Sequence, residues 1–246
     1  MNILVCISKA PDTTTKISFT EGNTKFNEDG VQYIVNPYDE WYALVRALEL
    51  KEANGGKVTT ISVGGADYDP IIRKALAIGA DDAVRINSTP EDAYQVAAEI
   101  AHYASSNNFD LILGGKETID YNGSQVIGMI AAILDQPFVS NATSLEVAGS
   151  EATIERDKQG GTEVVAVQLP AVISAAKGMA EQRIPNMRGI MAARSKPLNI
   201  VEPSGAESLT ETVSYALPPE KGDVKLIDPE DMEELVKLLH NEAKVI

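Results

Sequence analysis

The segment of residues 114–125 carries the residue types best suited to binding an anion. It follows an apolar, strand-like run and opens a helical pattern. Backbone N–H groups at a helix start have no partner within the helix, and the helix dipole favours negative charge there. The small and polar members of the segment are Asn122, Gly123, Ser124 and Gln125. The segment predicts a phosphate site, although Asn122 or Ser124 could equally serve only as a helix cap.

A second glycine turn, Val63-Gly64-Gly65-Ala66-Asp67, follows another strand-like run. It is comparable with the phosphate loop of ATP-pyrophosphatases, which resembles Ser-Gly-Gly-x-Asp-Ser. Val63 and Tyr68 stand where that loop has its serine ligands. We therefore predict a tight turn in which Asp67 or Asp69 caps a helix that begins near Pro70.

A third polar turn, Asn36-Pro37-Tyr38-Asp39, precedes a helical pattern that contains Trp41. Asn36 is a natural helix cap, and proline is favoured at the first helical position, so we predict that the helix starts at Pro37. The same turn would lie at the carboxyl edge of a sheet, where an adenine or a ribose could accept its hydrogen bonds. Both roles stay open.

No arrangement of residues for acid, base or nucleophilic catalysis is recognisable. His102 and His240 lie in helical patterns without a serine, cysteine or metal ligand at a catalytic spacing. The Gly-x-Ser-x-Gly, Walker and Gly-x-Gly-x-x-Gly motifs are absent. Cys6 is the one cysteine, which excludes an internal disulfide and a cysteine-based metal site. The sequence favours a domain that binds a nucleotide without transforming it and holds no metal.

The stretch from Lys177 to Lys196 is basic in an otherwise acidic chain, with a single acid at Glu181. It also contains methionine and isoleucine side chains that could be exposed. A solvated basic loop would explain the charges. An apolar anchor ringed by charge is also what a partner-docking loop requires, and methionine adapts to pockets of different shape.

The composition limits the classes of partner. A formal net charge of −15 and a pI near 4.5 argue against binding to nucleic acid or to an anionic membrane surface. No apolar run reaches the ~18 residues of a membrane span. The start of the chain leads straight into a strand-like segment without a targeting leader. We expect a cytoplasmic location, which the single cysteine also favours.

The pattern along residues 1–140 predicts βαβ units and therefore an α/β fold with a doubly wound, mostly parallel sheet. The strand candidates are Ile3–Ile7, Val58–Val63, Ala83–Ile86 and Phe109–Leu113. Helical stripes separate them, around Trp41, Ile72 and Val96, and another follows at Met129. Ligands of such sheets bind at the carboxyl ends of the strands, so the three turns described above should meet there.

The remainder of the chain predicts a small antiparallel extension and an arm. The extension comprises Thr153–Arg156, Glu163–Gln168 and Val172–Ala176. We divide the chain into a nucleotide-binding domain, residues 1–195, and a C-terminal arm, residues 196–246. The arm should end in an amphipathic helix that Asp228 caps, with Pro229 in its first turn. Such a helix needs another surface to cover its apolar face.

Taken together, these segments resemble the β subunit of electron-transfer flavoproteins along nearly the whole chain. The most specific match to the family signature lies in Ile154–Glu163 and Leu169–Ser174, with Gln159 where the family usually has an acid. Further matches occur in family order. They are Val5-Cys6-Ile7 with Pro11-Asp12, Asn36-Pro37, Gly115–Gln125 and Pro185–Met191.

The resemblance implies an adenine nucleotide α-hydrolase-like fold and a heterodimer. A partner α subunit would hold most of a redox-active FAD, while this subunit would bury AMP as a structural ligand. The residues around adenine and ribose would be Cys6, Asn36, Pro37, Tyr38, Asp39 and Val63. The residues at the phosphate would be Asp120, Asn122, Gly123, Ser124, Gln125 and Val126.

The resemblance leaves the nucleotide open between two types. Val126 replaces a hydroxyl residue of many AMP-binding members, and flavin-bifurcating members, which hold a second FAD, often have valine there. Gly128-Met129 is similar to the AMP-binding type, which we favour. A free-standing nucleotide hydrolase or stress-protein-like ATP binder, and a scaffold without nucleotide, are the alternatives of other classes.

The resemblance also implies how the chain meets its electron donors. A recognition loop would dock on acyl-CoA or related dehydrogenases while the flavin domain swings, with Met187 as the apolar anchor. This loop comprises Arg183, Ile184, Pro185, Asn186, Met187, Arg188, Gly189, Ile190 and Met191. Asp157 matches an acid that stabilises one orientation of the flavin domain.

Overall fold

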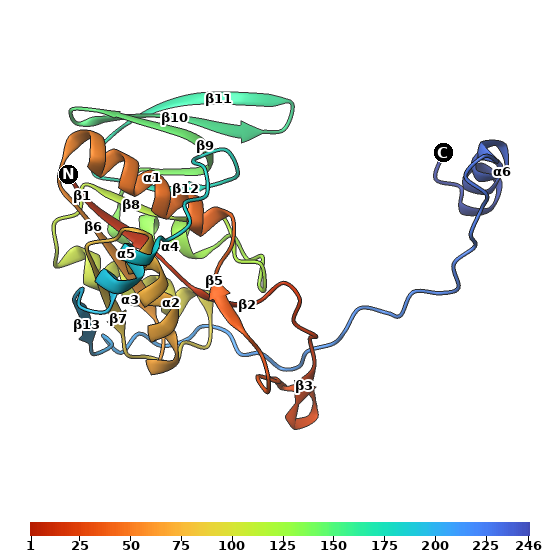
Figure 1. The fold of residues 1–246 in the computed structure, drawn as a ribbon, viewed down its shortest axis with the longest axis horizontal. Helices are drawn as coiled ribbons and strands as arrows, with labels where there is room; N and C mark the ends of the chain where they lie inside the picture. Colours follow the sequence, from red (N-terminus) through yellow and green to blue (C-terminus); the bar gives the residue numbers. More distant parts are fainter.

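A nine-stranded sheet runs through the body of the molecule in the computed structural model, which describes residues 1–246 (Figure 1). The strand order is β11-β10-β9-β12-β8-β1-β6-β7-β13. The parallel strands are β1 (Asn2–Cys6), β6 (Lys57–Val63), β7 (Asp82–Ile86), β8 (Leu111–Gly115), β9 (Phe138–Ala148), β12 (Ala171–Ala175) and β13 (Leu198–Val201). The antiparallel strands β10 (Glu151–Lys158) and β11 (Gly161–Gln168) complete the sheet at one edge.

Helices cover both faces of the sheet because its central strands are apolar on both sides. Alternate residues of β1 point to opposite faces. Ile3 and Val5 pack into one core cluster with helices α1 (Asp39–Asn54) and α2 (Asp69–Ile78). Leu4 packs into the other with α3 (Ala93–Ser105) and α4 (Val126–Leu134). The predicted doubly wound α/β fold is confirmed.

The direction of winding reverses beside β1. The chain moves from β1 to β6 and β7 on one side, and then returns to place β8 and β12 on the other. Two adjacent strands whose connections run in opposite directions leave a crevice at their carboxyl ends. The crevice in this fold lies between the ends of β1 and β8.

The predicted antiparallel extension is correct for two of its three segments. β10 and β11 form the expected antiparallel ribbon. The third segment, predicted as Val172–Ala176, is instead a parallel strand, β12, between β8 and β9. All residues of β12 are buried, as expected for a strand in the middle of a parallel sheet. The sequence did not reveal β9, because its polar residues break the apolar pattern.

Two small hairpins extend the carboxyl edge of the sheet. Strands β2 (Lys9–Pro11) and β5 (Tyr33–Val35) form the first. Strands β3 (Phe19–Thr20) and β4 (Lys25–Phe26) form the second, around a short 3-10 turn, η1 (Glu21–Asn23). Another such turn, η2 (Ala66–Tyr68), leads into α2.

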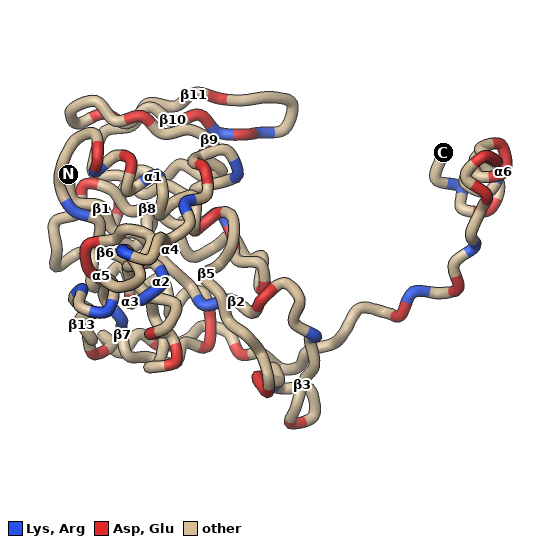
Figure 2. The backbone as a smooth tube through the Cα atoms, viewed as in Figure 1, with Lys and Arg blue, Asp and Glu red and all other residues tan.

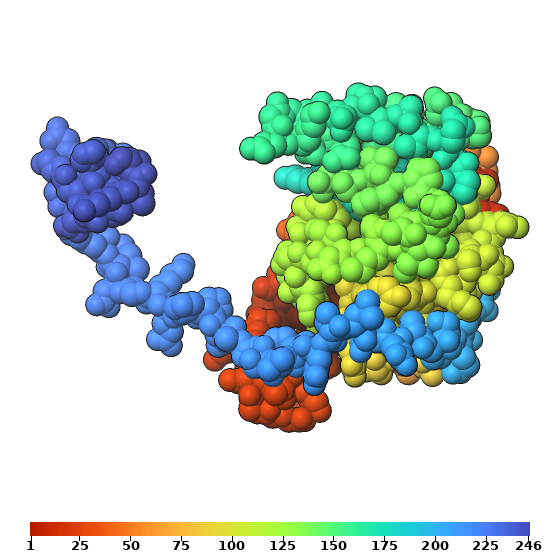
Figure 3. All heavy atoms as spheres, turned by 180° about the vertical axis from the view of Figure 1, so that it is seen from behind, coloured from red at the N-terminus to blue at the C-terminus, as the bar shows by residue number.

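The C-terminal arm begins inside the sheet. β13 lies within the range predicted as arm, residues 196–246, yet it pairs in parallel with β7. The chain then follows the body as far as the β3–β4 hairpin and leaves it (Figures 1 and 3). It ends in α6 (Met232–Lys237) and a π-helical turn, η3 (Leu238–Ala243), which stand apart from the body in both views.

The terminal helix starts later than predicted. Asp231, rather than Asp228, is its N-cap, because its side chain accepts a hydrogen bond from the Glu234 N–H at 3.0 Å. Asp228 accepts from the Glu230 N–H in the turn before it. No residue of α6 is buried. None of the helices in the molecule combines the length and the apolar character that a bilayer span requires.

Candidate functional site

A cavity of about 480 Å³ opens at the carboxyl edge of the sheet, where the winding reverses. The predicted site residues that line it are Cys6, Val63, Asp120, Gly123, Ser124, Gln125 and Val126. Its volume lies in the range of about 300–1,000 Å³ that is usual for small-molecule sites. The structure therefore brings together residues from three segments that are far apart in the sequence, the end of β1 and two of the three predicted turns. Asn36, Pro37, Tyr38, Asp39 and Asn122 are not among the lining residues.

The turn before α4 presents a row of unpaired backbone N–H groups. The amides of Gly123 to Ile127 donate to no carbonyl or side chain of the protein. Asn122 and Ser124 have positive φ angles of 49° and 50°, a conformation that costs energy for residues other than glycine. Successive amides in such a turn converge on one point and favour an anion. A phosphate could therefore be held here mainly by the backbone.

Asn36 does not cap α1, contrary to the prediction. The helix begins at Asp39, after Tyr38 with a φ of 66°. The Asn36 side chain is fully buried and uses both ends of its amide on the loop that leads to α4. Its Nδ2 donates to the Glu117 carbonyl at 3.1 Å, and its Oδ1 accepts from the Ile119 N–H at 2.9 Å. Asn36 therefore holds the loop that leads to α4 instead of capping α1.

Glu40 at the start of α1 lines the cavity and was not predicted. Its carboxylate accepts from the Ser8 N–H at 2.8 Å and from the Ser8 hydroxyl at 2.7 Å. Gly115 lies directly behind it, and a methyl group there would be 2.9 Å from the Glu40 backbone nitrogen. Burial raises the pKa of Glu40 to about 8, and Asp120 and Asp39 add to the shift. Burial thus favours the uncharged form of Glu40, which would reduce its repulsion of an anionic ligand.

The turn after β6 does not use its aspartates as helix caps, contrary to the prediction. Asp69 pairs with Arg85 of β7 at 2.8 Å. Asp67 pairs with Lys9, whose ammonium also lies 3.8 Å from the centre of the Tyr33 ring. The lysine nearest the anion-binding loop, Lys116, pairs with Glu117 at 3.0 Å. Because both lysines at the cavity already have acidic partners, the unpaired backbone amides are the groups best placed to hold an anion there.

Cys6 lies at the end of β1 on the floor of the cavity. It is buried, and burial raises the pKa of its thiol well above the ordinary value. A thiol that stays protonated is a poor nucleophile. Cys6 can pack against a ligand but is not suited to attack one.

The first part of the arm lines the cavity at Thr210 and Thr212, which the sequence did not predict. The buried carboxylate of Glu99 accepts hydrogen bonds from the N–H groups of Ser204, Gly205 and Ala206. Asp92 accepts from the Leu209 and Thr210 N–H groups at 2.7 and 2.9 Å. Two carboxylates on one helix thus hold this extended segment. Sequence patterns do not reveal such contacts, because the donors are backbone groups.

The predicted recognition loop, residues 183–191, lies on the α1–α2 side of the sheet, and its second half forms α5 (Met187–Ala193). Asn186 caps α5, accepting from the Gly189 N–H at 2.8 Å. Ile184 and Met187 expose 82% and 73% of their surface, and Met191 is also exposed. The loop presents a continuous set of apolar side chains to solvent, as an anchor for a partner would.

Asp157 lies far along the β10–β11 ribbon, opposite Thr162 in the antiparallel register, and is exposed. Basic residues flank it in the sequence, Arg156 and Lys158. Figure 2 shows basic and acidic residues close together near the free end of the β10–β11 ribbon. Figure 2 also shows acidic residues gathered around α6. The acidic residues of the α6 region therefore stand apart from the body.

Comparison with known proteins identifies the family. The model of the electron transfer flavoprotein domain matches residues 23–206. The chain is 40% identical over 260 residues to the electron transfer flavoprotein subunit beta of Bacillus subtilis (strain 168), with all of both chains covered. It is 36% identical over 250 residues to the subunit beta of Syntrophomonas wolfei, with 100% of this chain and 98% of the other covered. The human subunit beta is 32% identical over 243 residues, which is 94% of this chain and 95% of the other. With matches of this extent, the chain belongs to the family of electron-transfer flavoprotein β subunits.

Proposed function

We propose that this protein is the β subunit of a heterodimeric electron carrier that accepts electrons from acyl-CoA dehydrogenase-type flavoenzymes and passes them to an electron-transfer chain. It acts in the cytoplasm and is not itself an enzyme. An α subunit holds most of the FAD, and this subunit buries one AMP as a structural ligand. FAD, when bound between the subunits, supplies the electron-accepting and electron-donating chemistry. The row of unpaired amides at Gly123–Ile127 is the observation that carries the proposal.

The cavity suits a mononucleotide. Apolar walls at Ile61, Val63 and Ile100 could enclose a base, and the amides at the start of α4 would bind a single phosphate. The acids at its rim, Glu91, Asp92 and Asp120, disfavour a longer polyphosphate. Two of the buried groups in the cavity are poorly suited to catalysis, since Cys6 stays a thiol and the Glu40 carboxylate is tied to Ser8. A nucleotide held there would stay unchanged.

The exposed side chains of residues 183–191 would make the contact with the dehydrogenase. Met187 and Ile184 provide the apolar anchor, and Arg188 provides positive charge at its rim. A partner that buries this anchor would gain most of its affinity from a few residues. The exposed arm beyond residue 216 provides a second surface, for the α subunit.

We expect Met187→Ala to lower kcat/KM for electron uptake by roughly 30-fold, as for loss of an interface hot spot. The assay is reduction of the purified heterodimer by an acyl-CoA dehydrogenase supplied with butyryl-CoA. The flavin absorbance spectrum should not change, because in the proposed heterodimer the α subunit holds most of the FAD.

Val164→Ala provides the matched control, since Val164 is similarly exposed, at 64%, but lies on β11. It should leave the rate within a factor of about two. Unaltered electron uptake by Met187→Ala would remove the loop from the proposed function.

A further inference from the structure

The docking loop has almost no hydrophobic core of its own. Of the residues of α5, only Ala193 is buried. A seven-residue helix is too short to be stable in isolation. The shape of the loop must therefore come from contacts with the body, and the strongest of these are made with α2 and α1.

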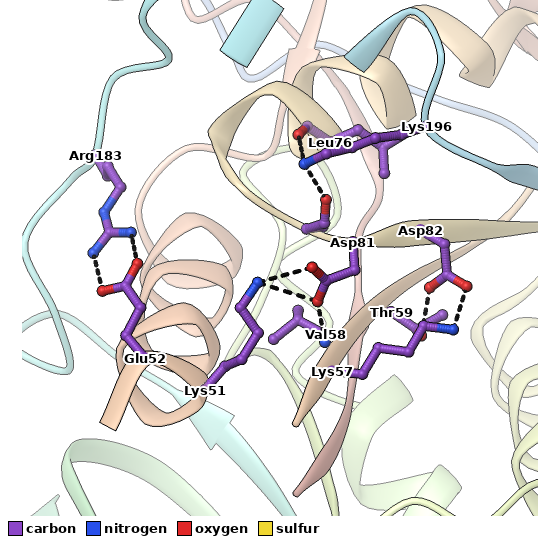
Figure 4. A network of polar contacts seen from close by, with 11 residues as sticks. Lys51, Glu52, Lys57, Val58, Thr59, Leu76, Asp81, Asp82, Arg183 and Lys196 are labelled. Carbon is purple, nitrogen blue, oxygen red and sulfur yellow. Dashed lines mark hydrogen bonds and ion pairs between the residues drawn. The ribbon is translucent and has the colours of Figure 1, made fainter. Parts of the chain in front are cut away.

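A pair of reciprocal contacts joins the end of α5 to the end of α2. Arg73 of α2 donates from Nη1 to the carbonyl of Ala193, the last residue of α5, at 2.8 Å, and to the Lys196 carbonyl at 2.6 Å. Lys196 in turn donates from Nζ to the carbonyls of Leu76 and Ala80 at 2.9 and 2.5 Å, as Figure 4 shows for Leu76. The last carbonyls of a helix lack partners within it and attract cations. The carbonyls at the end of α5 thus accept hydrogen bonds from Arg73 of α2, and those at the end of α2 accept from Lys196, which follows α5.

The backbones of α5 and α2 also touch directly. A side chain at Gly189 would collide with the carbonyl oxygen of Ala77. Only glycine lets α5 approach this closely. The cation contacts and the close approach together fix both the distance and the rotation of α5.

The other end of the loop is held by α1. Arg183 makes two contacts with Glu52, at 2.7 and 3.2 Å, as drawn in Figure 4. The Trp41 indole N–H donates to the Arg183 carbonyl at 3.2 Å. Because the Arg183–Glu52 pair is largely exposed, it contributes little stability. The half-buried contacts of Arg73 and Lys196 are the firmer hold.

We propose that Arg73 and Lys196 are positioning residues for electron uptake, which hold the exposed face of α5 in the shape that a dehydrogenase recognises. This inference rests on the proposed docking role of residues 183–191. A loop that occupies its docking shape about a tenth of the time binds with about tenfold weaker apparent affinity. Neither residue needs to touch the partner.

Arg73→Met in the full heterodimer tests the proposal. It keeps the flexible, unbranched stem of the side chain, although methionine is shorter, and it removes every donor. The KM for the heterodimer, measured with a butyryl-CoA-reduced acyl-CoA dehydrogenase, should rise about tenfold while kcat stays unchanged. Amide hydrogen exchange within Met187–Ala193 should accelerate by a similar factor. Arg73→Lys, which restores a donor, should recover part of the affinity.

Arg46→Met is the matched control. Arg46 is also a half-buried arginine on a helix that donates to a backbone carbonyl, that of Leu145 at 2.9 Å, but this contact lies away from the loop. It should change neither the KM nor the exchange of α5. If Arg73→Met does not fold, Lys196→Met provides the same test with the same readouts.

The outcomes separate the two proposals. If Arg73→Met and Lys196→Met change neither the KM nor the amide exchange of α5, while Met187→Ala still slows electron uptake, the positioning role is overturned and the docking role stands. A tenfold rise in KM for Arg46→Met, equal to that of Arg73→Met, would also overturn the positioning role. If Met187→Ala has no effect, the docking role itself fails and the positioning role fails with it.

Discussion

Removal of residues 217–246 should weaken the complex with the α subunit by at least about 100-fold. The segment exposes large apolar side chains that the body does not cover, among them Leu226 at 90%, Val224 at 74% and Met232 at 60%. Fully burying one such side chain contributes about 1.5–3 kcal/mol, so the loss of two anchors already exceeds a factor of 100. Sedimentation or titration calorimetry of the two purified subunits measures the effect.

The cut after Ala216 preserves the body. The contacts of the arm with Glu99 and Asp92, and the stacking of Tyr215 on Phe19, all lie before it. The melting temperature of the isolated subunit should therefore stay within about 2 °C. A matched pair in the intact chain sharpens the test: Leu226→Ser should weaken the complex about tenfold, whereas its neighbour Lys225→Ser should not. Full affinity of the shortened chain would contradict a role of the arm in assembly.

Asn36→Leu should remove the nucleotide from the purified protein and destabilise the fold by roughly 2–5 kcal/mol. The substitution leaves the partly buried Glu117 carbonyl and Ile119 N–H without partners, and each such group costs about 1–3 kcal/mol. The loop that presents the amides of Gly123–Ile127 would lose its attachment to the body. Denaturant unfolding and nucleotide analysis of the denatured protein report the two effects separately.

Two variants serve as controls for Asn36. Asn36→Asp keeps the acceptor for the Ile119 N–H and loses the donor to Glu117, so its effect should be intermediate. Asn107→Leu removes one exposed contact, to the Tyr103 carbonyl, and should change stability by less than about 0.5 kcal/mol. Retention of the nucleotide by a folded Asn36→Leu protein would show that this loop does not depend on Asn36.

The parallel core was predictable because its strands are short apolar runs separated by helical stripes. All four strand candidates of residues 1–140 appear as β1, β6, β7 and β8 within one or two residues of their predicted bounds. β9 and β13 were not predictable, since polar or exposed residues interrupt them and the sheet itself holds them in place. Position in a sheet, unlike apolar periodicity, depends on distant segments.

In the candidate site, too, local sequence features were predictable and contacts with distant segments were not. The loop of residues 114–125 could be recognised from its glycine and amide residues, and it does line the cavity. Asn36 was predicted to cap α1, but its side chain contacts Glu117 and Ile119 instead, because a local cap and a long-range contact look alike in sequence. Glu40 and the Asp92 and Glu99 contacts with the arm were invisible. Their roles arise from burial and from backbone donors that are more than 30 residues away.

Mass spectrometry and absorbance of the denatured heterodimer test the central claim most directly. We predict one AMP and one FAD for each pair of subunits, with the AMP retained by this subunit alone when it is purified without its partner. Two FAD molecules per pair would instead assign the cavity to a second flavin. A cavity that retains no nucleotide, or an isolated chain that turns over ATP, would contradict a redox-silent nucleotide site.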